Sequence, residues 1–298
     1  MSEQQPNRPT PVVDPAALRE IADGVWVIPD HRVPLVPNIG IVVGSHSALV
    51  VDTGMGRRNG QLVLETARRL AGTRELVLTL THFHPEHGYG AEPFKGEAEI
   101  LYNSEQAREL ADKGEAYLGM FRGMGPSIAE ALDGTMLVEA DTHYDDTSHE
   151  IDLGGRRAIL RTWGKAHTRG DQIVFLPDDG ILFTGDLAEE KTFPIFPWFP
   201  PEDTDIDADN WIAALDDCLI LRPDIVVPGH GEIGGPEIVS GVRDYIANLG
   251  ERVLAARRSG KASDEIIAEL GPKIGGEHPD WHFPEWIDFA IRYHASLI

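Results

Sequence analysis

Residues 81–90 read THFHPEHGYG, and four residues of types that bind metals fall within six positions of this segment. His82 and His84 are separated by one residue, so both imidazoles can reach one cation at the usual Zn–N distance of about 2.0–2.1 Å. Glu86 and His87 follow at once and can face a second cation. The segment therefore predicts part of a metal site.

Three further residues of metal-binding type extend the pattern, each beside a glycine near the end of an apolar run. GKAHTRGD contains His167, LFTGDL contains Asp186, and VVPGHGE contains His230. Glycine permits the tight turns that such loops need. Together with the first four, these residues predict a two-metal site. The other histidines lack such a setting and are interpreted as surface or packing residues: His31, His46, His143, His149, His278, His282 and His294.

The elements that must position these residues are predicted to be mostly strands. ELVLTLTH (75–82) is a continuous apolar run, typical of a buried strand, and it leads directly into the first motif. Ligand loops at the carboxyl ends of strands are common in open α/β sheets. Further strands are predicted at 24–29, 38–44, 47–54, 98–103 and 223–231, hairpins at 148–164 and 171–186, and a helix at 57–72.

This order predicts an α+β fold, a four-layer αβ/βα sandwich built from two strand-rich halves. Residues 1–15 are polar and rich in proline, which predicts a flexible leader, and 16–298 are predicted to form a single domain. Segment 104–132 predicts a helical insertion that either packs or acts as a lid. Segment 236–298 predicts a helical C-terminal part, whose aromatic residues pack either on the sandwich or against the second copy of a homodimer.

The composition limits the classes of partner that we expect this protein to bind. The net charge of −23 counts against nucleic acid, whose binding depends on Lys and Arg. No apolar run is long enough for a membrane helix, and the polar start does not resemble a signal peptide. The single cysteine, Cys218, excludes an intramolecular disulfide. We therefore expect a cytoplasmic protein that acts on a small molecule.

The motifs HxHx(acid)H, a later single histidine, TGD and PGHG occur in an order that resembles the metallo-β-lactamase fold superfamily, from the first strand to about residue 232. VVDTG (50–54) resembles its first motif. The resemblance implies a first metal site, a second metal site and a bridging carboxylate. The implied first site consists of His82, His84 and His167, and the implied second site of Glu86, His87 and His230. The implied bridging carboxylate is Asp186.

One residue departs from the family pattern. Glu86 stands where the family usually has Asp. Glutamate keeps the ligand chemistry but is one methylene longer, so it either binds the second metal with shifted geometry or swings free as a general base. Asp186 resembles the bridging carboxylate of the family's thioesterases, lactonases and general hydrolases, which true metallo-β-lactamases generally lack.

The resemblance implies a zinc-dependent hydrolase with two Zn²⁺ per chain and Asp186 and Glu86 as catalytic residues. A metal-bound hydroxide would attack an ester, lactone, thioester or amide-type bond. Asp52 and Asp171 are interpreted either as residues that orient ligand histidines or as turn caps. Four aromatic residues after Asp186 predict either an apolar substrate pocket, for a medium-sized apolar or aromatic molecule, or a cap on the core or on a dimer surface. They are Phe193, Phe196, Trp198 and Phe199.

Three other functional classes are alternatives to a zinc-dependent hydrolase. A mononuclear iron oxygenase that resembles the persulfide dioxygenases of the superfamily would hold one Fe²⁺ with His82, His167 and Asp186. The full second ligand set favours two metals instead. A nuclease is disfavoured by the negative charge, and a non-catalytic binding protein by the complete ligand set.

Overall fold

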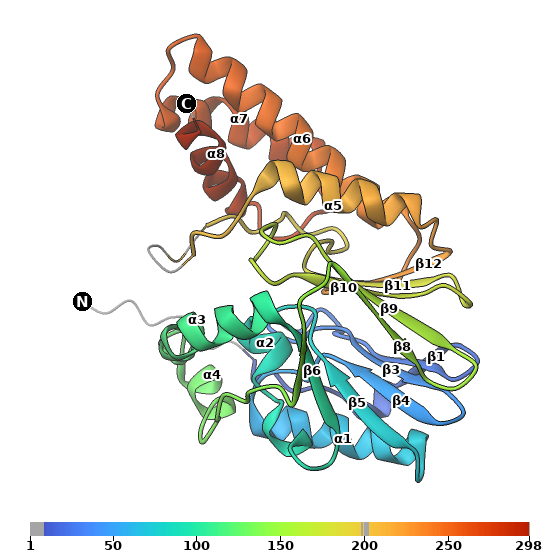
Figure 1. The fold of residues 1–298 in the computed structure, drawn as a ribbon. Coiled ribbons are helices and arrows are strands. Elements are labelled where there is room, and N and C mark those ends of the chain that lie inside the picture. Colours follow the sequence, from blue (N-terminus) through green and yellow to red (C-terminus); the bar gives the residue numbers. More distant parts are fainter. Residues whose placement is uncertain (1–8, 198, 200–202, 298) are drawn as a thin grey trace.

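Two β-sheets pack face to face in the computed structural model, and helices cover their outer faces (Figure 1). The structure describes residues 9–197, 199 and 203–297. The first sheet has the order β1-β2-β3-β4-β5-β6-β7, with β1 Arg19–Ala22, β2 Val25–Ile28, β3 Ile39–Val43, β4 Ser47–Val51, β5 Glu75–Thr79, β6 Glu99–Asn103 and β7 Thr142–Tyr144. The second has the order β12-β11-β10-β9-β8, with β8 Ser148–Asp152, β9 Arg157–Thr162, β10 Gln172–Leu176, β11 Ile181–Gly185 and β12 Ile225–Pro228.

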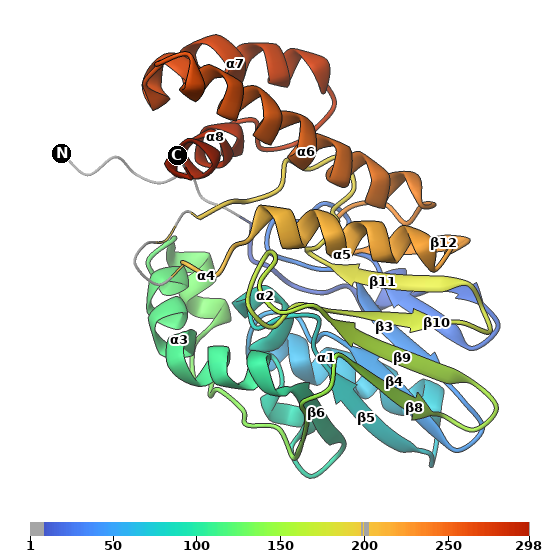
Figure 2. The same cartoon turned by 45° about the horizontal axis from the view of Figure 1, so that its top comes forward.

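Helices lie on both outer sides of this pair of sheets, as the turned view shows (Figure 2). Helix α1 covers the first sheet, and α3 and α4 lie beside it. Helices α5 to α8 lie on the side of the second sheet. Their bounds are α1 Gly56–Ala71, α2 Pro85–Gly88, α3 Ser104–Arg122, α4 Pro126–Ala131, α5 Ala208–Ile220, α6 Glu237–Arg258, α7 Ser263–Glu277 and α8 Trp286–Ser296, with short 3-10 turns η1 Pro15–Ala17 and η2 Glu92–Phe94.

Side chains that alternate along the strands build three separate cores. In β4, Val50 joins the core under α1, whereas Leu49 and Val51 join the core between the sheets. In β10, Ile173 joins the core under the C-terminal helices and Val174 the core between the sheets. Strands that bury both faces read as continuous apolar runs. Three cores separate four layers, which confirms the predicted αβ/βα sandwich.

Parallel pairing brings the ligand loops to one edge. Strands β4, β5 and β6 run parallel, and so do β11 and β12. The carboxyl ends of parallel neighbours lie at the same edge of a sheet, so the loops after β4 and β5 meet, as do the loops after β11 and β12. The two sheets therefore supply the site from both sides.

The predicted strands and hairpins are confirmed, with ends that differ by a few residues. The sequence patterns missed the edge strands β1 and β7. Their side chains are mostly exposed or half-buried, so neither strand shows an apolar run. Pairing with β2 and β6 holds them in place, a tertiary contact that local pattern does not report.

The expected flexible leader is wrong for its second half. Val13 is buried, and its N–H donates to Asn59 Oδ1 at 3.1 Å. Asn59 Nδ2 donates in turn to the carbonyl of Pro11 at 2.7 Å. Thus α1 holds this segment against the first core, although its composition is that of a loop. Residues 1–8 lie outside the described part of the chain.

The two expected helical segments are helical. Segment 104–132 forms α3 and α4, and 236–298 contains α6 to α8. Trp281, Trp286 and Tyr293 pack against the core of their own chain, and a homodimer contact stays a prediction. Within the described residues, no helix combines the length and the apolar character needed to cross a bilayer.

Candidate metal centre

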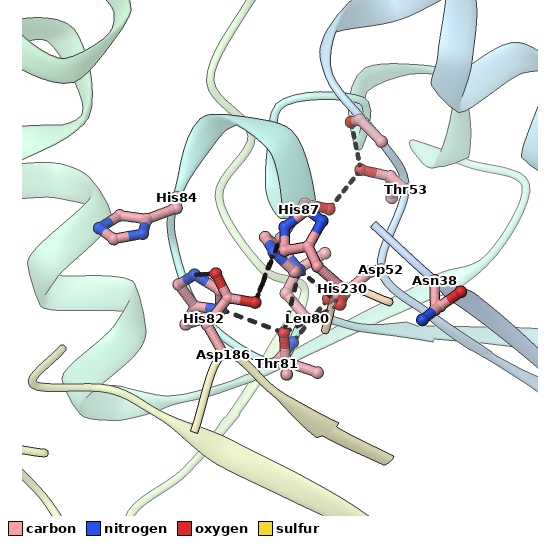
Figure 3. A network of polar contacts seen from close by, with 12 residues as sticks. Asn38, Asp52, Thr53, Leu80, Thr81, His82, His84, His87, Asp186 and His230 are labelled. Carbon is pink, nitrogen blue, oxygen red and sulfur yellow. Dashed lines mark hydrogen bonds and ion pairs between the residues drawn. The ribbon is translucent and has the colours of Figure 1, made fainter. Parts of the chain in front are cut away.

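Seven side chains from four segments converge at the shared edge of the two sheets. Figure 3 labels five of them: His82, His84, His87, Asp186 and His230. They form two groups, and the candidate ligand atoms within each group all lie within 4.8 Å of one another. The first group is His82, His84, His167 and Asp186, and the second is Glu86, His87, His230 and Asp186. The structure thus brings together every metal ligand that the sequence predicted, and Asp186 belongs to both groups.

A single helical turn arranges the first motif. The chain leaves β5 at Thr79, and Pro85 begins α2 at a position that suits proline. The carbonyl of His84 accepts hydrogen bonds from the N–H groups of His87 and Gly88 at 3.1 and 3.0 Å. A side chain at Gly88 would lie 2.7 Å from Leu80. This tight turn therefore directs the side chains of its four candidate ligands toward the same site.

Asp186 lies between the two groups of imidazoles. Its Oδ2 is 3.8 Å from His82 Nε2, and its Oδ1 is 3.2 Å from His87 Nε2 and 3.9 Å from His230 Nε2. Gly229 of the PGHG motif makes this possible, because a Cβ there would lie 2.0 Å from Asp186 Oδ1. The position of Asp186 therefore suits a carboxylate that two cations share.

The donor atoms fit divalent cations. Four of them are buried without a hydrogen-bond partner among the described residues: His82 Nε2, Glu86 Oε2, His87 Nε2 and Asp186 Oδ1. Buried polar atoms normally find partners, so a cluster of exceptions calls for an explanation. Imidazole nitrogens and carboxylate oxygens are ligands of zinc and of iron. A pair of cations would satisfy all four atoms.

Protonation in the first group suits metal binding as well. Burial, reinforced by neighbouring imidazoles, lowers the pKa values of His82 and His84 well below 6.5. Burial likewise lowers the pKa of His167 to about 4. These rings are therefore neutral near pH 7, and each keeps a lone pair for a cation.

Burial acts differently on the second group. It raises the pKa of Glu86 to about 7. Burial opposes protonation of His87, but the carboxylates of Asp186 and Asp52 outweigh it and raise the pKa of His87 well above 6.5. Burial also tends to raise the pKa of Asp186, yet His87 and His230 hold that pKa well below 3.8. Strong shifts of this kind are typical of functional sites.

Residues behind the ligands fix their orientation. Asp52 Oδ2 lies 2.8 Å from His87 Nδ1 and accepts the Thr81 hydroxyl at 2.9 Å. Asp52 has a φ of +68°, a conformation that most residues avoid but Asp tolerates. His230 Nδ1 lies 2.9 Å from the carbonyl of Val36. Of the two predicted orienting acids, Asp52 therefore contacts a ligand histidine.

The other predicted orienting acid has a different role. Asp171 accepts hydrogen bonds from the N–H and the hydroxyl of Thr168 at 2.7 and 2.6 Å. It therefore caps the turn that follows His167, which is the alternative that the sequence left open for this residue.

We expect Asp52→Asn to weaken binding of the second cation by about 10- to 100-fold, the usual effect of losing a carboxylate behind a ligand histidine. The amide keeps the shape of Asp52 but not the charge that holds His87 Nδ1–H. Competition with a chelator would measure the affinity. Asp146→Asn, at an exposed carboxyl, serves as the matched control. Equal affinities in both variants would contradict the role given to Asp52.

The structure separates the four aromatic residues predicted to contact substrate. Phe193 and Phe196 are fully buried and pack with Tyr245 and Trp211 under the C-terminal helices, so in this structure they serve the core. Phe199 is half-buried, and its ring lies 5.5 Å from that of Tyr117. Trp198 lies outside the described residues.

Sequence reasoning missed two residues at the site. The ring of Tyr117 on α3 stacks on His84 at 5.3 Å and 22°. Its spacing from Leu110 and Phe121 marks a buried helix face, but nothing local points that face at a metal site. Glu189 is buried close to the second group, where burial, reinforced by Asp186, raises its pKa well above 4.5. No signal in LAEEK distinguishes this acid from its neighbour.

Comparisons with known proteins agree with this geometry. The family model described as Metallo-beta-lactamase superfamily matches residues 32–230. The linear primary-alkylsulfatase of Pseudomonas sp. (strain ATCC 19151) is 25% identical over 267 residues, which cover 78% of this chain and 49% of the alkylsulfatase. The human acyl-coenzyme A thioesterase MBLAC2 is 26% identical over 257 residues, which cover 78% of this chain and 88% of the thioesterase.

Solved structures extend the similarity of fold to most of the chain. The stereoselective inverting sec-alkylsulfatase Pisa1 from Pseudomonas sp. superposes with a TM-score of 0.72 at 16% identity. The match covers 94% of this chain and 50% of Pisa1. The chain thus spans about half the length of the alkylsulfatases that it matches.

Proposed function

The chain belongs to the metallo-beta-lactamase superfamily, and we propose that it is a hydrolase with a binuclear metal site, ordinarily occupied by zinc. The observation that carries this proposal is the pair of buried ligand groups that share Asp186. Three imidazoles complete the first group, and Glu86 with two imidazoles completes the second. Neither group is typical of a structural zinc site, which usually contains cysteine.

We assign the residues as follows. One cation would be held by His82, His84 and His167, and the other by Glu86, His87 and His230. Asp186 would bind both cations. Two divalent cations, when bound, supply Lewis acidity and bring the pKa of a coordinated water towards about 7. Asp52 keeps a proton on His87 Nδ1, which leaves Nε2 free for ligation. Asp186, which both ligand groups share, is the group that we expect to hold the two cations at their spacing and to shuttle a proton.

We propose an ester-type bond in a medium-sized apolar molecule as the substrate. Phe199, which is half-buried, is the ring that we expect to contact the substrate, and it lies 5.5 Å from the ring of Tyr117. Tyr117 and Phe83 are buried behind it, beside His84. Aromatic walls with few polar groups are typical of sites for apolar ligands. The two relatives named above are a linear primary-alkylsulfatase and an acyl-coenzyme A thioesterase, and a sulfate ester and a thioester are both ester-type bonds. The net charge of −23 supports a small molecule over nucleic acid.

Metal analysis and chelation test the proposal together. We expect elemental mass spectrometry to find about two zinc per chain in protein expressed without added metal. Removal by a chelator should lower hydrolysis of aryl esters, thioesters, lactones or alkyl sulfates by at least roughly 10³-fold, because the metals supply the Lewis acid and the nucleophile. Zinc should restore the rate.

The competing function gives a different result. A mononuclear iron oxygenase would contain about one iron and little zinc, and it would consume oxygen with persulfide substrates. That outcome would overturn the hydrolase proposal. Activity confined to small, highly charged substrates would overturn the proposed substrate class alone.

A further inference from the structure

The loop that carries His167 has no regular structure of its own. It runs from Trp163 to Asp171, between β9 and β10. Among the described residues, no carboxylate lies within 4.0 Å of the His167 ring, in contrast to His87, which Asp52 holds. The ring lies 5.3 Å from that of Trp211 and interacts with the backbone of Ile195. Because the loop has no regular structure, the position of His167 also depends on the contacts that hold the loop backbone.

A carboxylate from another element binds this backbone. Glu109 lies on α3, and its Oε2 accepts hydrogen bonds from the N–H groups of Arg169 and Gly170, both at 3.1 Å. Its side chain is 1% exposed. Hydrogen bonds to a buried charged acceptor are stronger than those between neutral groups. Glu109 thus binds the backbone of this loop at the second and third residues after His167.

Helix α3 also packs directly on the same loop. A Cβ at Gly170 would lie 2.4 Å from the Cα of Gln106, so only glycine allows this approach. At the start of α3, Asn103 Nδ2 donates to the carbonyl of Gly170 at 2.8 Å. Both backbone groups of Gly170 are therefore held by residues of, or next to, one helix.

A half-buried lysine balances the charge of Glu109. Lys113 Nζ lies 2.8 Å from Glu109 Oε1 and 2.6 Å from Asp205 Oδ2. The other oxygen of Asp205 lies 2.6 Å from Lys165 Nζ, at the opposite end of the His167 loop. These contacts link Glu109, Lys113, Asp205 and Lys165 into one chain of ion pairs, in which Glu109 is buried and Lys165 exposed.

From these contacts, we infer that Glu109 is a positioning residue that sets the affinity of the first metal group by holding the His167 loop. The inference rests on the proposed binuclear site. It goes beyond that proposal because it states that α3 sets the metal affinity of the first group but not that of the second group. The second group draws its ligands from α2 and the loops after β11 and β12, and Glu109 contacts none of them in the described residues.

Binding of Co²⁺ to the full chain tests the inference without any substrate. We expect Glu109→Gln to weaken binding to the first group by about 10- to 100-fold, as loss of an outer contact to a metal ligand usually does. Chelator competition and the visible bands of Co²⁺ would report the affinity. The same measurement in a Glu86→Gln background, which weakens the second group, would assign the loss to the first group.

Two further variants distinguish the positioning of the His167 loop from effects of charge balance and of folding. Glu115→Gln, at an exposed position on α3, is the matched control and should bind as the unmodified protein does. Glu109→Gln combined with Lys113→Met also removes the lysine that pairs with Glu109, and we expect first-group affinity to stay low. Restored affinity in this double variant would overturn the inference, because charge balance would then be the cause.

Other outcomes are equally decisive. Unchanged affinity in Glu109→Gln, with two Co²⁺ bound by the unmodified protein, would overturn the inference and leave the proposed function standing. Equal weakening of both groups would also overturn it. Failure of the unmodified protein to bind Co²⁺ at all would overturn both proposals.

Discussion

Asp186→Asn is expected to lower hydrolysis by roughly 10³-fold or more, at or above the usual cost of removing one group that stabilises a transition state. Asp186 is the one residue that both ligand groups share. An amide of the same shape offers one neutral oxygen where the carboxylate offers two anionic ones. The variant therefore loses a ligand of each cation in a single substitution.

Metal content and rate should be measured on the same preparation. We expect Asp186→Asn to retain fewer than two zinc per chain while circular dichroism shows an unchanged fold. Asp178→Asn is the control, since Asp178 is a surface carboxylate that pairs with Arg157 at 3.2 Å. An Asp186→Asn protein with full zinc content and normal turnover would refute the shared-ligand assignment.

Glu86→Gln is expected to reduce metal content from about two ions to about one and to lower turnover by roughly 10²-fold, within the range for lost ligand or outer contacts. Glu86 is buried and its Oε2 lacks a hydrogen-bond partner in the described residues. The remaining members of the second group are two imidazoles and the shared Asp186, which bind a cation more weakly without the second carboxylate.

A second substitution at this position tests the length of the side chain. Glu86→Asp keeps the charge and shortens the reach by one methylene, so it should bind more metal than Glu86→Gln. Glu130→Gln, at an exposed position on α4, is the control. If Glu86→Gln held two ions as tightly as the unmodified protein, Glu86 would be a free base and not a ligand.

The cluster of candidate metal ligands was predictable because each residue belongs to a short local motif. Imidazoles and carboxylates follow apolar runs in glycine-containing segments, and the structure places all seven together. The strands were predictable for a related reason, since most of them bury both faces and so consist of continuous apolar residues. Edge strands β1 and β7 gave no such signal because solvent covers part of each.

Roles that depend on distant contacts had no local signature. Phe193 and Phe196 stand close to Asp186 in the chain, yet they are buried under the C-terminal helices. Proximity in sequence to a ligand does not determine which core an aromatic ring enters. Val13 shows the converse, because a segment with the composition of a leader is held by Asn59 of α1.

The sequence by itself determined the candidate ligand set and the layered fold, because motif chemistry and the period of apolar residues are local properties. Only the tertiary structure decided which residues support those ligands: Asp52 behind His87, Tyr117 against His84, and Glu109 on the His167 loop. Each of these contacts joins segments at least 33 positions apart in the chain, as Tyr117 and His84 are. Packing of whole elements makes such contacts, and no single segment contains the information that specifies them.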